Sequence, residues 1–109
     1  MTDRLMSLLG LCRRAGKIVL GNDPVIDSIN LRKAKLVVIA QDCSQHTAKG
    51  VLSCAHRNNV KAHVIPYTKD DISLAVGKYT AVLSITDDGF AKKADSLICS
   101  IECTDLKED

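Results

Sequence analysis

The chain has 109 residues, of which 46% are hydrophobic and only 3% aromatic, with 15 Lys and Arg against 13 Asp and Glu. This length fits one compact domain with a single hydrophobic core and leaves no room for a second domain. Because aromatic rings are so scarce, a single-strand binder that stacks bases on aromatic side chains is disfavoured. No apolar run approaches the ~20 residues of a membrane-spanning helix, and the N-terminus lacks the layout of a signal peptide. We therefore expect a soluble, cytoplasmic protein with no membrane partner.

Charge is distributed unevenly along the chain. Up to Lys93 there are 14 basic and 8 acidic residues, whereas from Ala94 onward one Lys stands against five acids. A basic body suits an anionic partner, of which nucleic acid is the commonest, although solvated helix faces would give the same balance. This division predicts a single domain over residues 1–97 and an acidic tail over residues 98–109.

Apolar spacing predicts the elements of the first half of the chain. A first helix, which Gly16 can end, carries an apolar stripe at i, i+3, i+4 and i+7 formed by Leu5, Leu8, Leu9 and Cys12. A short strand over residues 17–20 follows. Asp23 stands directly before Pro24, so we expect Asp23 to cap a second helix. The unbroken apolar run over residues 36–40 is typical of a strand buried on both faces.

The second half of the chain continues the alternation. Ser44 can cap a helix that ends near residue 58, and Thr68 with Asp71 resembles a capping box for a short helix that Gly77 ends. A last helix is expected from Asp87 through Lys93. Further strands are expected over residues 60–65, 81–85 and, at a sheet edge, 97–101. Strands alternating with helices at this interval indicate an α/β fold, a three-layer α/β/α sandwich.

The five cysteines do not resemble a disulfide framework. Their number is odd, no C-x-x-C pair occurs, and Cys12, Cys54 and Cys99 lie inside apolar patterns. Cys99 and Cys103 lack the further ligands that would complete a tetrahedral zinc site. We expect small buried thiols in a reducing compartment, with no bound metal.

The sequence offers no positive sign of catalysis. The glycine-rich nucleotide-binding signatures and the hydrolase motif G-x-S-x-G are absent. A Cys54–His46 nucleophilic pair has no local support. The acidic pairs 70–71 and 87–88 each open a helix, where negative charge is favoured, and are interpreted as caps. We expect no enzymatic activity, no cofactor and no small-molecule substrate.

A series of junctions between elements resembles a known family. They are Arg-Arg-Ala-Gly-Lys-Ile-Val-Leu-Gly over residues 13–21, Lys-Ala-Lys-Leu-Val-Val-Ile-Ala-Gln-Asp over 33–42, and the segments 75–78 and 81–91. In this order they resemble the kink-turn RNA-binding superfamily of large-subunit ribosomal proteins seven-Ae and thirty-e, closest to its small bacterial YlxQ-like members. The resemblance covers roughly residues 4–93 and implies an α/β/α sandwich around a four-stranded mixed sheet.

The resemblance also implies an RNA-binding surface built from three segments. A helix N-terminus offers unpaired N–H groups, glycine permits close approach, and lysines supply a salt-sensitive attraction to phosphate. Bent RNA exposes base edges that a regular duplex hides. The matching positions are Gly21, Asn22, Asp23, Pro24 and Asp27 at the second helix, Lys33 and Lys35 in a basic turn, and Lys78, Tyr79, Thr80 and Ala81 in a later loop.

The start of the second helix departs from the family pattern. The family pattern has an amide, then an acidic or polar residue, and a lysine one turn later. This chain has Asp23, Pro24 and Asp27 at those places, and an ionised Asp cannot donate a hydrogen bond. Two hypotheses therefore stand: a non-enzymatic RNA-binding protein associated with ribosomal or other structured RNA, or a protein-interaction module that has lost kink-turn recognition. A further basic cluster consists of Arg13, Arg14 and Lys17. Two interpretations of it stay open: it complements the dipole of the first helix, or it makes a second RNA contact.

Overall fold

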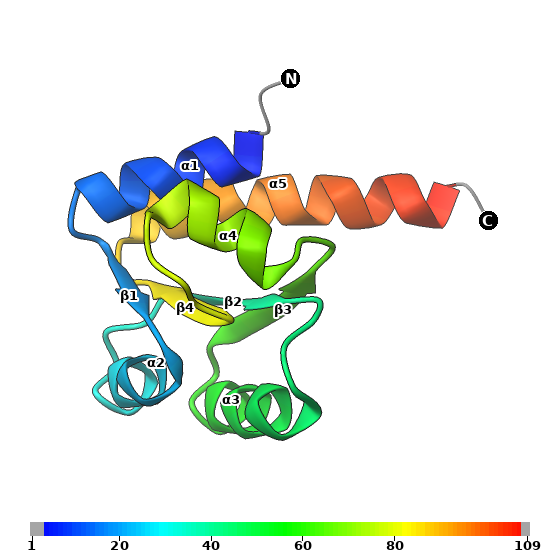
Figure 1. The fold of residues 1–109 in the computed structure, drawn as a ribbon. Helices are drawn as coiled ribbons and strands as arrows, with labels where there is room; N and C mark the ends of the chain where they lie inside the picture. The colour runs from blue at the N-terminus through cyan, green and yellow to red at the C-terminus, as the bar shows by residue number, and fades with distance from the viewer. Residues whose placement is uncertain (1–3, 108–109) are drawn as a thin grey trace.

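Helices and strands alternate along the chain, as Figure 1 shows. The computed structural model describes the backbone of residues 4–107 and the side chains of residues 4–100. The elements are α1 (Arg4–Arg14), β1 (Ile18–Leu20), α2 (Asn22–Asn30), β2 (Leu36–Ala40), α3 (Gln45–Arg57), β3 (Lys61–Ile65), α4 (Lys69–Val76), β4 (Val82–Ile85) and α5 (Asp88–Lys107).

The four strands form one mixed sheet in the order β1-β4-β2-β3. β4 is antiparallel to both β1 and β2, whereas β2 and β3 run parallel. All five residues of β2 are buried, as expected of a strand that has a neighbour on each side and a helical layer on each face. The predictions of a central strand over residues 36–40 and of a four-stranded mixed sheet are confirmed.

Helices cover both faces of the sheet, which gives the three layers (Figure 1). One core cluster joins α1, α4 and α5 to the sheet, and a second joins α2 and α3 to its other face. The predicted apolar stripe of α1 faces the first cluster and is buried throughout, at Leu5, Leu8, Leu9 and Cys12. The three-layer α/β/α sandwich is therefore confirmed.

Several predicted helix ends are confirmed by their hydrogen bonds. The Ser44 hydroxyl accepts from the Thr47 backbone N–H at 3.2 Å and caps α3. Thr68 and Asp71 form the predicted capping box of α4, since each side chain accepts from the other residue's backbone N–H. Gly77 ends α4 in the left-handed conformation at φ 80°, which costs glycine little because it has no Cβ.

The expected capping of α2 by Asp23 is wrong. The N-cap is Gly21, with φ 100°, and the first helical hydrogen bond runs from the Val25 N–H to the Gly21 carbonyl at 3.0 Å. The helix therefore begins two residues earlier, and Pro24 lies inside its first turn. That position tolerates proline, because the first N–H groups of a helix have no intrahelical acceptor.

The expected edge strand over residues 97–101 is also wrong. These residues lie in α5, which runs on to Lys107. Ala91, Ala94 and Ile98 are buried against the sheet, at i, i+3 and i+7, which is a helical spacing. The division into a domain over residues 1–97 and a tail over 98–109 stays a prediction. The side chains from residue 101 onward lie outside the described residues.

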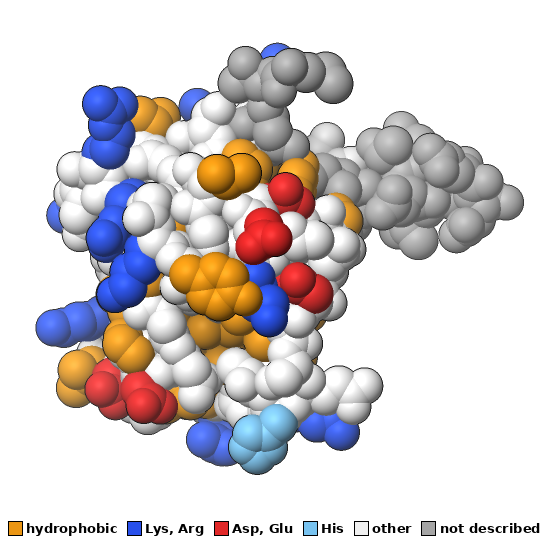
Figure 2. Space-filling model, in the orientation of Figure 1, with side chains coloured by type: hydrophobic (Ala, Val, Ile, Leu, Met, Phe, Trp, Pro, Cys, Tyr) orange, Lys and Arg blue, Asp and Glu red, His pale blue; other side chains and the backbone are white. Residues whose placement is uncertain are grey.

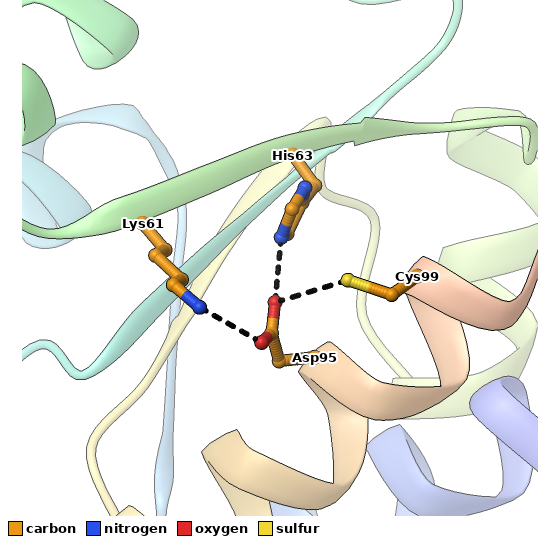
Figure 3. A network of polar contacts seen from close by, with 4 residues as sticks. All are labelled: Lys61, His63, Asp95 and Cys99. Carbon is orange, nitrogen blue, oxygen red and sulfur yellow. Dashed lines mark hydrogen bonds and ion pairs between the residues drawn. The ribbon is translucent and has the colours of Figure 1, made fainter. Parts of the chain in front are cut away.

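A polar network joins the edge strand β3 to α5 (Figure 3). The Asp95 carboxylate lies 2.8 Å from His63 Nε2 and 3.1 Å from Lys61 Nζ, and the Cys99 thiol lies 3.9 Å from the same carboxylate. Burial raises the pKa of Asp95, but the hydrogen bonds from His63 and Lys61 outweigh this effect and hold the pKa below its ordinary value. The contact ties the edge strand β3 to α5, which covers one face of the sheet.

The cysteines differ in their surroundings. Cys12 and Cys54 are buried as predicted, whereas Cys43 is half-buried and Cys99 is exposed. The expectation of a buried Cys99 is wrong because its neighbour Ile98 faces the core, and the next residue of a helix is turned about 100° away. Burial raises the pKa of the Cys12 thiol to about 11, so this thiol is protonated and unreactive at neutral pH.

Candidate nucleic-acid interface

The end of β1 and the start of β4 meet through one buried threonine. The Gly21 N–H donates to the Thr80 hydroxyl and to the Val82 carbonyl, both at 3.2 Å. The Thr80 hydroxyl in turn donates to the Val82 carbonyl at 2.6 Å, and its backbone N–H donates to the Ser73 hydroxyl at 3.3 Å. Residues that are 59 positions apart are thereby fixed at one point.

Strand pairing explains why these segments lie together. β1 and β4 are antiparallel neighbours, so the residues that follow β1 meet those that precede β4. We call this surface the α2–β4 junction; it comprises Gly21, Asn22, Asp23, Lys78, Tyr79, Thr80 and Ala81. Within it Asn22, Asp23, Lys78 and Tyr79 are exposed. Thr80 is only 4% exposed, so it positions its neighbours and does not present its own side chain.

The N-terminus of α2 is open at this junction. Gly21 provides no side-chain cap, and helix geometry leaves the N–H groups of Asn22 and Asp23 without an intrahelical acceptor. These N–H groups and the helix dipole favour an anion. The exposed carboxylates of Asp23 and Asp27 act in the opposite sense, since they add negative charge beside the same helix end.

Tyr79 forms the exposed apolar part of the junction. Tyr79 is 64% exposed, and Lys69 Nζ lies 5.8 Å from the centroid of its ring. The hydrogen bond with Tyr79 raises the pKa of Lys69, so its positive charge is retained. The Lys69 backbone N–H donates to the Asp42 carboxylate at 2.8 Å. Sequence reasoning missed Lys69 and Asp42, because their place beside Tyr79 depends on the packing of α4 and the loop after β2.

The basic turn at Lys33 and Lys35 lies at the other end of the sheet. The Lys35 N–H donates to the Ile85 carbonyl at 2.7 Å, at the end of β4. Lys17 lies at the same end, where its carbonyl accepts from the Thr86 N–H at 2.9 Å. The length of β2 separates this end from the α2–β4 junction, about 16 Å at the usual rise per strand residue. The structure therefore divides the expected RNA-binding positions between two ends of the molecule.

Arg13 and Arg14 lie at the end of α1, three to four residues before Lys17 and beside the end of α4. Both are exposed in the last turn of α1, and they line a depression between α1 and α4 together with Gly77, the residue before Lys78. Figure 2 shows basic side chains gathered along this side of the molecule, with acidic side chains below them over α2. The two arginines thus extend the basic margin of the α2–β4 junction.

The described residues form no candidate metal site, and they do not bring the Cys54–His46 pair together. Between residues 4 and 100 there is no group of three or more His, Cys, Asp or Glu side chains placed to hold a metal ion. Cys54 and His46 both lie on α3, eight positions and about 12 Å apart along the helix axis, and the Cys54 thiol donates to the Asn30 carboxamide oxygen at 3.5 Å. None of the helices described over residues 4–107 is long and apolar enough to span a membrane.

Comparison with known proteins identifies the family. The sequence model of the ribosomal protein L7Ae/L30e/S12e/Gadd45 family matches residues 3–95. The chain belongs to this family. The L7Ae/L30e resemblance drawn from the junction sequences is confirmed.

Curated family members are similar over nearly their whole length. The RNA-binding protein YlxQ of Enterococcus faecium is 37% identical over 88% of this chain and 92% of its own. The YlxQ protein of Bacillus subtilis is 38% identical over 84% and 91%. The large ribosomal subunit protein eL30 of rice, Oryza sativa subsp. japonica, is 33% identical over 81% of each chain. The family members that the chain resembles thus include bacterial and plant proteins.

Solved structures share the fold. A Bacillus halodurans protein of unknown function superposes with a TM-score of 0.85 at 28% identity, over 89% of this chain and 98% of that chain. The Giardia lamblia 15.5kD RNA binding protein superposes with a TM-score of 0.76 at 20% identity, over 94% and 92%. The second likeness concerns the fold alone.

Proposed function

We propose that this protein is a non-enzymatic, cytoplasmic RNA-binding protein of the ribosomal-protein type, which recognises structured, kink-turn-like RNA and associates with the ribosome or with translation. The observation that carries the proposal is the α2–β4 junction, where Thr80 holds an uncapped helix N-terminus beside an exposed loop. The name of the YlxQ relatives, RNA-binding protein, supports it.

Each part of the junction has a distinct task in this proposal. The open N–H groups of Asn22 and Asp23 face the RNA backbone or a base edge. Lys78 attracts phosphate. The Tyr79 ring, with Lys69 beneath it, presents an apolar surface to an unstacked base of an irregular RNA. Arg13 and Arg14 meet phosphates farther along the same side, and ribosomal RNA is the partner that the eL30 relatives suggest.

A second candidate function is a protein-interaction module on the same fold. The observation that favours it is the pair of exposed carboxylates at the start of α2, Asp23 and Asp27. Both would lie beside the RNA in the first proposal, where they repel phosphate. In the second proposal the surface that binds RNA in other family members binds a protein partner instead.

Salt dependence of RNA affinity separates the two. We expect affinity for a kink-turn RNA to fall steeply with salt, and Lys78→Ala to lower the logarithmic salt slope by roughly 0.7–0.9. Lys49→Ala, an exposed lysine on α3, serves as the matched control and should leave the slope unchanged. An RNA affinity that does not change with salt concentration, or no binding to a kink-turn RNA at low salt, would favour the protein-interaction module.

The two ends of the sheet are distinguished in the same titration. If one RNA reaches around the sandwich, Lys33→Ala, Lys35→Ala and Lys17→Ala each lower the slope as Lys78→Ala does. If the RNA contacts the α2–β4 junction alone, these three variants behave like the Lys49→Ala control. A straight duplex of equal length, titrated in parallel, reports the part of the affinity that is attraction to any phosphate backbone.

A further inference from the structure

An exposed apolar strip runs between α1 and α4. Leu74 of α4 is 86% exposed and Leu11 of α1 is 52% exposed, and both line one depression between the two helices. Met6 and Ala75 line the adjoining depression, again with Leu74. Gly10 lets the helices approach closely, since a Cβ at this position would lie 3.1 Å from the Ala75 carbonyl oxygen. A cluster of exposed large apolar side chains on one face marks an interaction surface.

The strip has opposite charges at its two ends. Asp70 and Asp71 stand in the first turn of α4 and line depressions that also contain Leu74. Arg13 and Arg14 stand in the last turn of α1, beside the other end of α4. Figure 2 shows apolar side chains between basic ones on the left and acidic ones on the right, with one further basic side chain beside the lowest acidic one. The acidic end makes this strip a poor surface for phosphate.

We propose that two copies of this chain associate through the apolar strip between α1 and α4, which we call the α1–α4 face, about a twofold axis close to Leu74. A twofold axis brings the same patch of both copies together in reversed direction. Leu74 and Leu11 of each copy then pack against those of the other. Asp70 of one copy faces Arg14 of its partner, and this pair occurs twice across the interface. In the dimer this pairing takes the place of the phosphate contact proposed for Arg14. A surface with an apolar centre between opposite charges is therefore complementary to a second copy of itself. A partner that is acidic throughout or basic throughout would match only one end of this surface.

The first test measures self-association of the nuclease-treated full chain by sedimentation equilibrium over a concentration series. We expect a reversible monomer–dimer equilibrium, and a dissociation constant at least about tenfold higher for Leu74→Ser. Leu31→Ser is the matched control, because Leu31 is 65% exposed at the end of α2, away from this face. A wild-type chain that stays monomeric up to about 1 mM, or a dimer that both leucine variants affect equally, would overturn the proposal.

The second test uses the symmetry of the proposed interface. Asp70→Arg and Arg14→Glu, each alone, place like charges at both ends of the dimer and should weaken it. Mixed together, one chain carries two basic residues and the other two acidic ones, so both charge pairs are restored. We expect the mixture to form a heterodimer more readily than either variant forms a homodimer. Equal association of the two single variants and their mixture would contradict a twofold arrangement on this face.

Discussion

His63 on β3 and Asp95 on α5 bring Nε2 and a carboxylate oxygen to 2.8 Å across 32 positions of sequence. Both side chains are mostly shielded from water, with exposures of 18% and 22%. Because β3 is an edge strand with only β2 as a neighbour, this contact and the Lys61–Asp95 ion pair add a second attachment on the helical side.

We expect Asp95→Asn to lower the free energy of unfolding by about 1 kcal/mol at neutral pH. The pKa of Asp95 is lower in the folded protein than its ordinary value of 3.8, so the ionised carboxylate stabilises the fold above that value. The contribution is lost as the pH falls through the folded pKa. Urea denaturation of both proteins at pH 7 and pH 3 measures the difference, which should shrink at pH 3. Asp27→Asn, at an exposed site on α2, should show no such change.

Leu8→Ala should lower the free energy of unfolding by about 2–5 kcal/mol, because Leu8 is 4% exposed in the first core cluster and its loss leaves a cavity. Leu74→Ala, on the adjoining helix but 86% exposed, should change the free energy by no more than about 0.5 kcal/mol. Urea denaturation at a concentration low enough to avoid self-association compares the two. Equal losses would contradict the packing of α1 against the sheet.

Thr80→Val should weaken RNA binding more than its effect on folding explains. The substitution keeps the side-chain volume but removes the hydroxyl that bonds to the Gly21 N–H and the Val82 carbonyl, at a cost of about 1–3 kcal/mol of stability. Thr80→Ser retains the hydroxyl and should restore both properties. RNA affinity is measured below the unfolding temperature of each variant. If Thr80→Val binds RNA as well as wild type, the junction is not the RNA surface.

The triple substitution Asp23→Asn, Pro24→Glu and Asp27→Lys should raise affinity for a kink-turn RNA. The amide regains a donor, the glutamate accepts from a base amine, and the lysine replaces repulsion with attraction. By analogy with DNA contacts, a recovered base contact or phosphate contact contributes on the order of 1–3 kcal/mol. Helix α2 should persist, because its N-cap is Gly21 and no substituted side chain caps it.

Two RNAs are titrated at fixed salt to interpret that result. A gain on the kink-turn RNA but not on a straight duplex supports recognition by the α2–β4 junction. Equal gains on both RNAs would show attraction to charge alone. No gain on either RNA would indicate that the RNA surface lies elsewhere, at Arg13, Arg14 and Lys17.

The fold could be predicted wherever local signals agreed with one another. The stripe of α1, the run of β2 and the caps Ser44, Thr68 and Gly77 each combine a pattern with a start or stop signal. The second half of α5 could not be predicted, because the apolar run over residues 97–101 fits a strand as well as a buried helix face. No glycine or proline separates Lys93 from that run, and this absence of a stop signal could have indicated the continuous helix.

The candidate site was predicted residue by residue but not in its arrangement. The family resemblance pointed to Gly21 and the loop at residues 78–81, yet their contact depends on the pairing of β1 with β4, which no local pattern specifies. The burial of Thr80 follows from the same pairing. The family resemblance assigns Lys35 and Gly21 to the same RNA-binding surface, but the two residues flank opposite ends of α2 and of the sheet.

The position of β4 has a consequence for the order in which the protein can be assembled during synthesis. β4 lies between β1 and β2, although it is the last strand of the chain to be made. Until it emerges from the ribosome, β1 has no hydrogen-bonding neighbour and the Gly21 N–H has neither of its acceptors. A nascent chain that stops before Thr80 can fold α3 against β2 and β3, but it holds no α2–β4 junction. Any ligand of that surface therefore waits until nearly the whole domain has been translated.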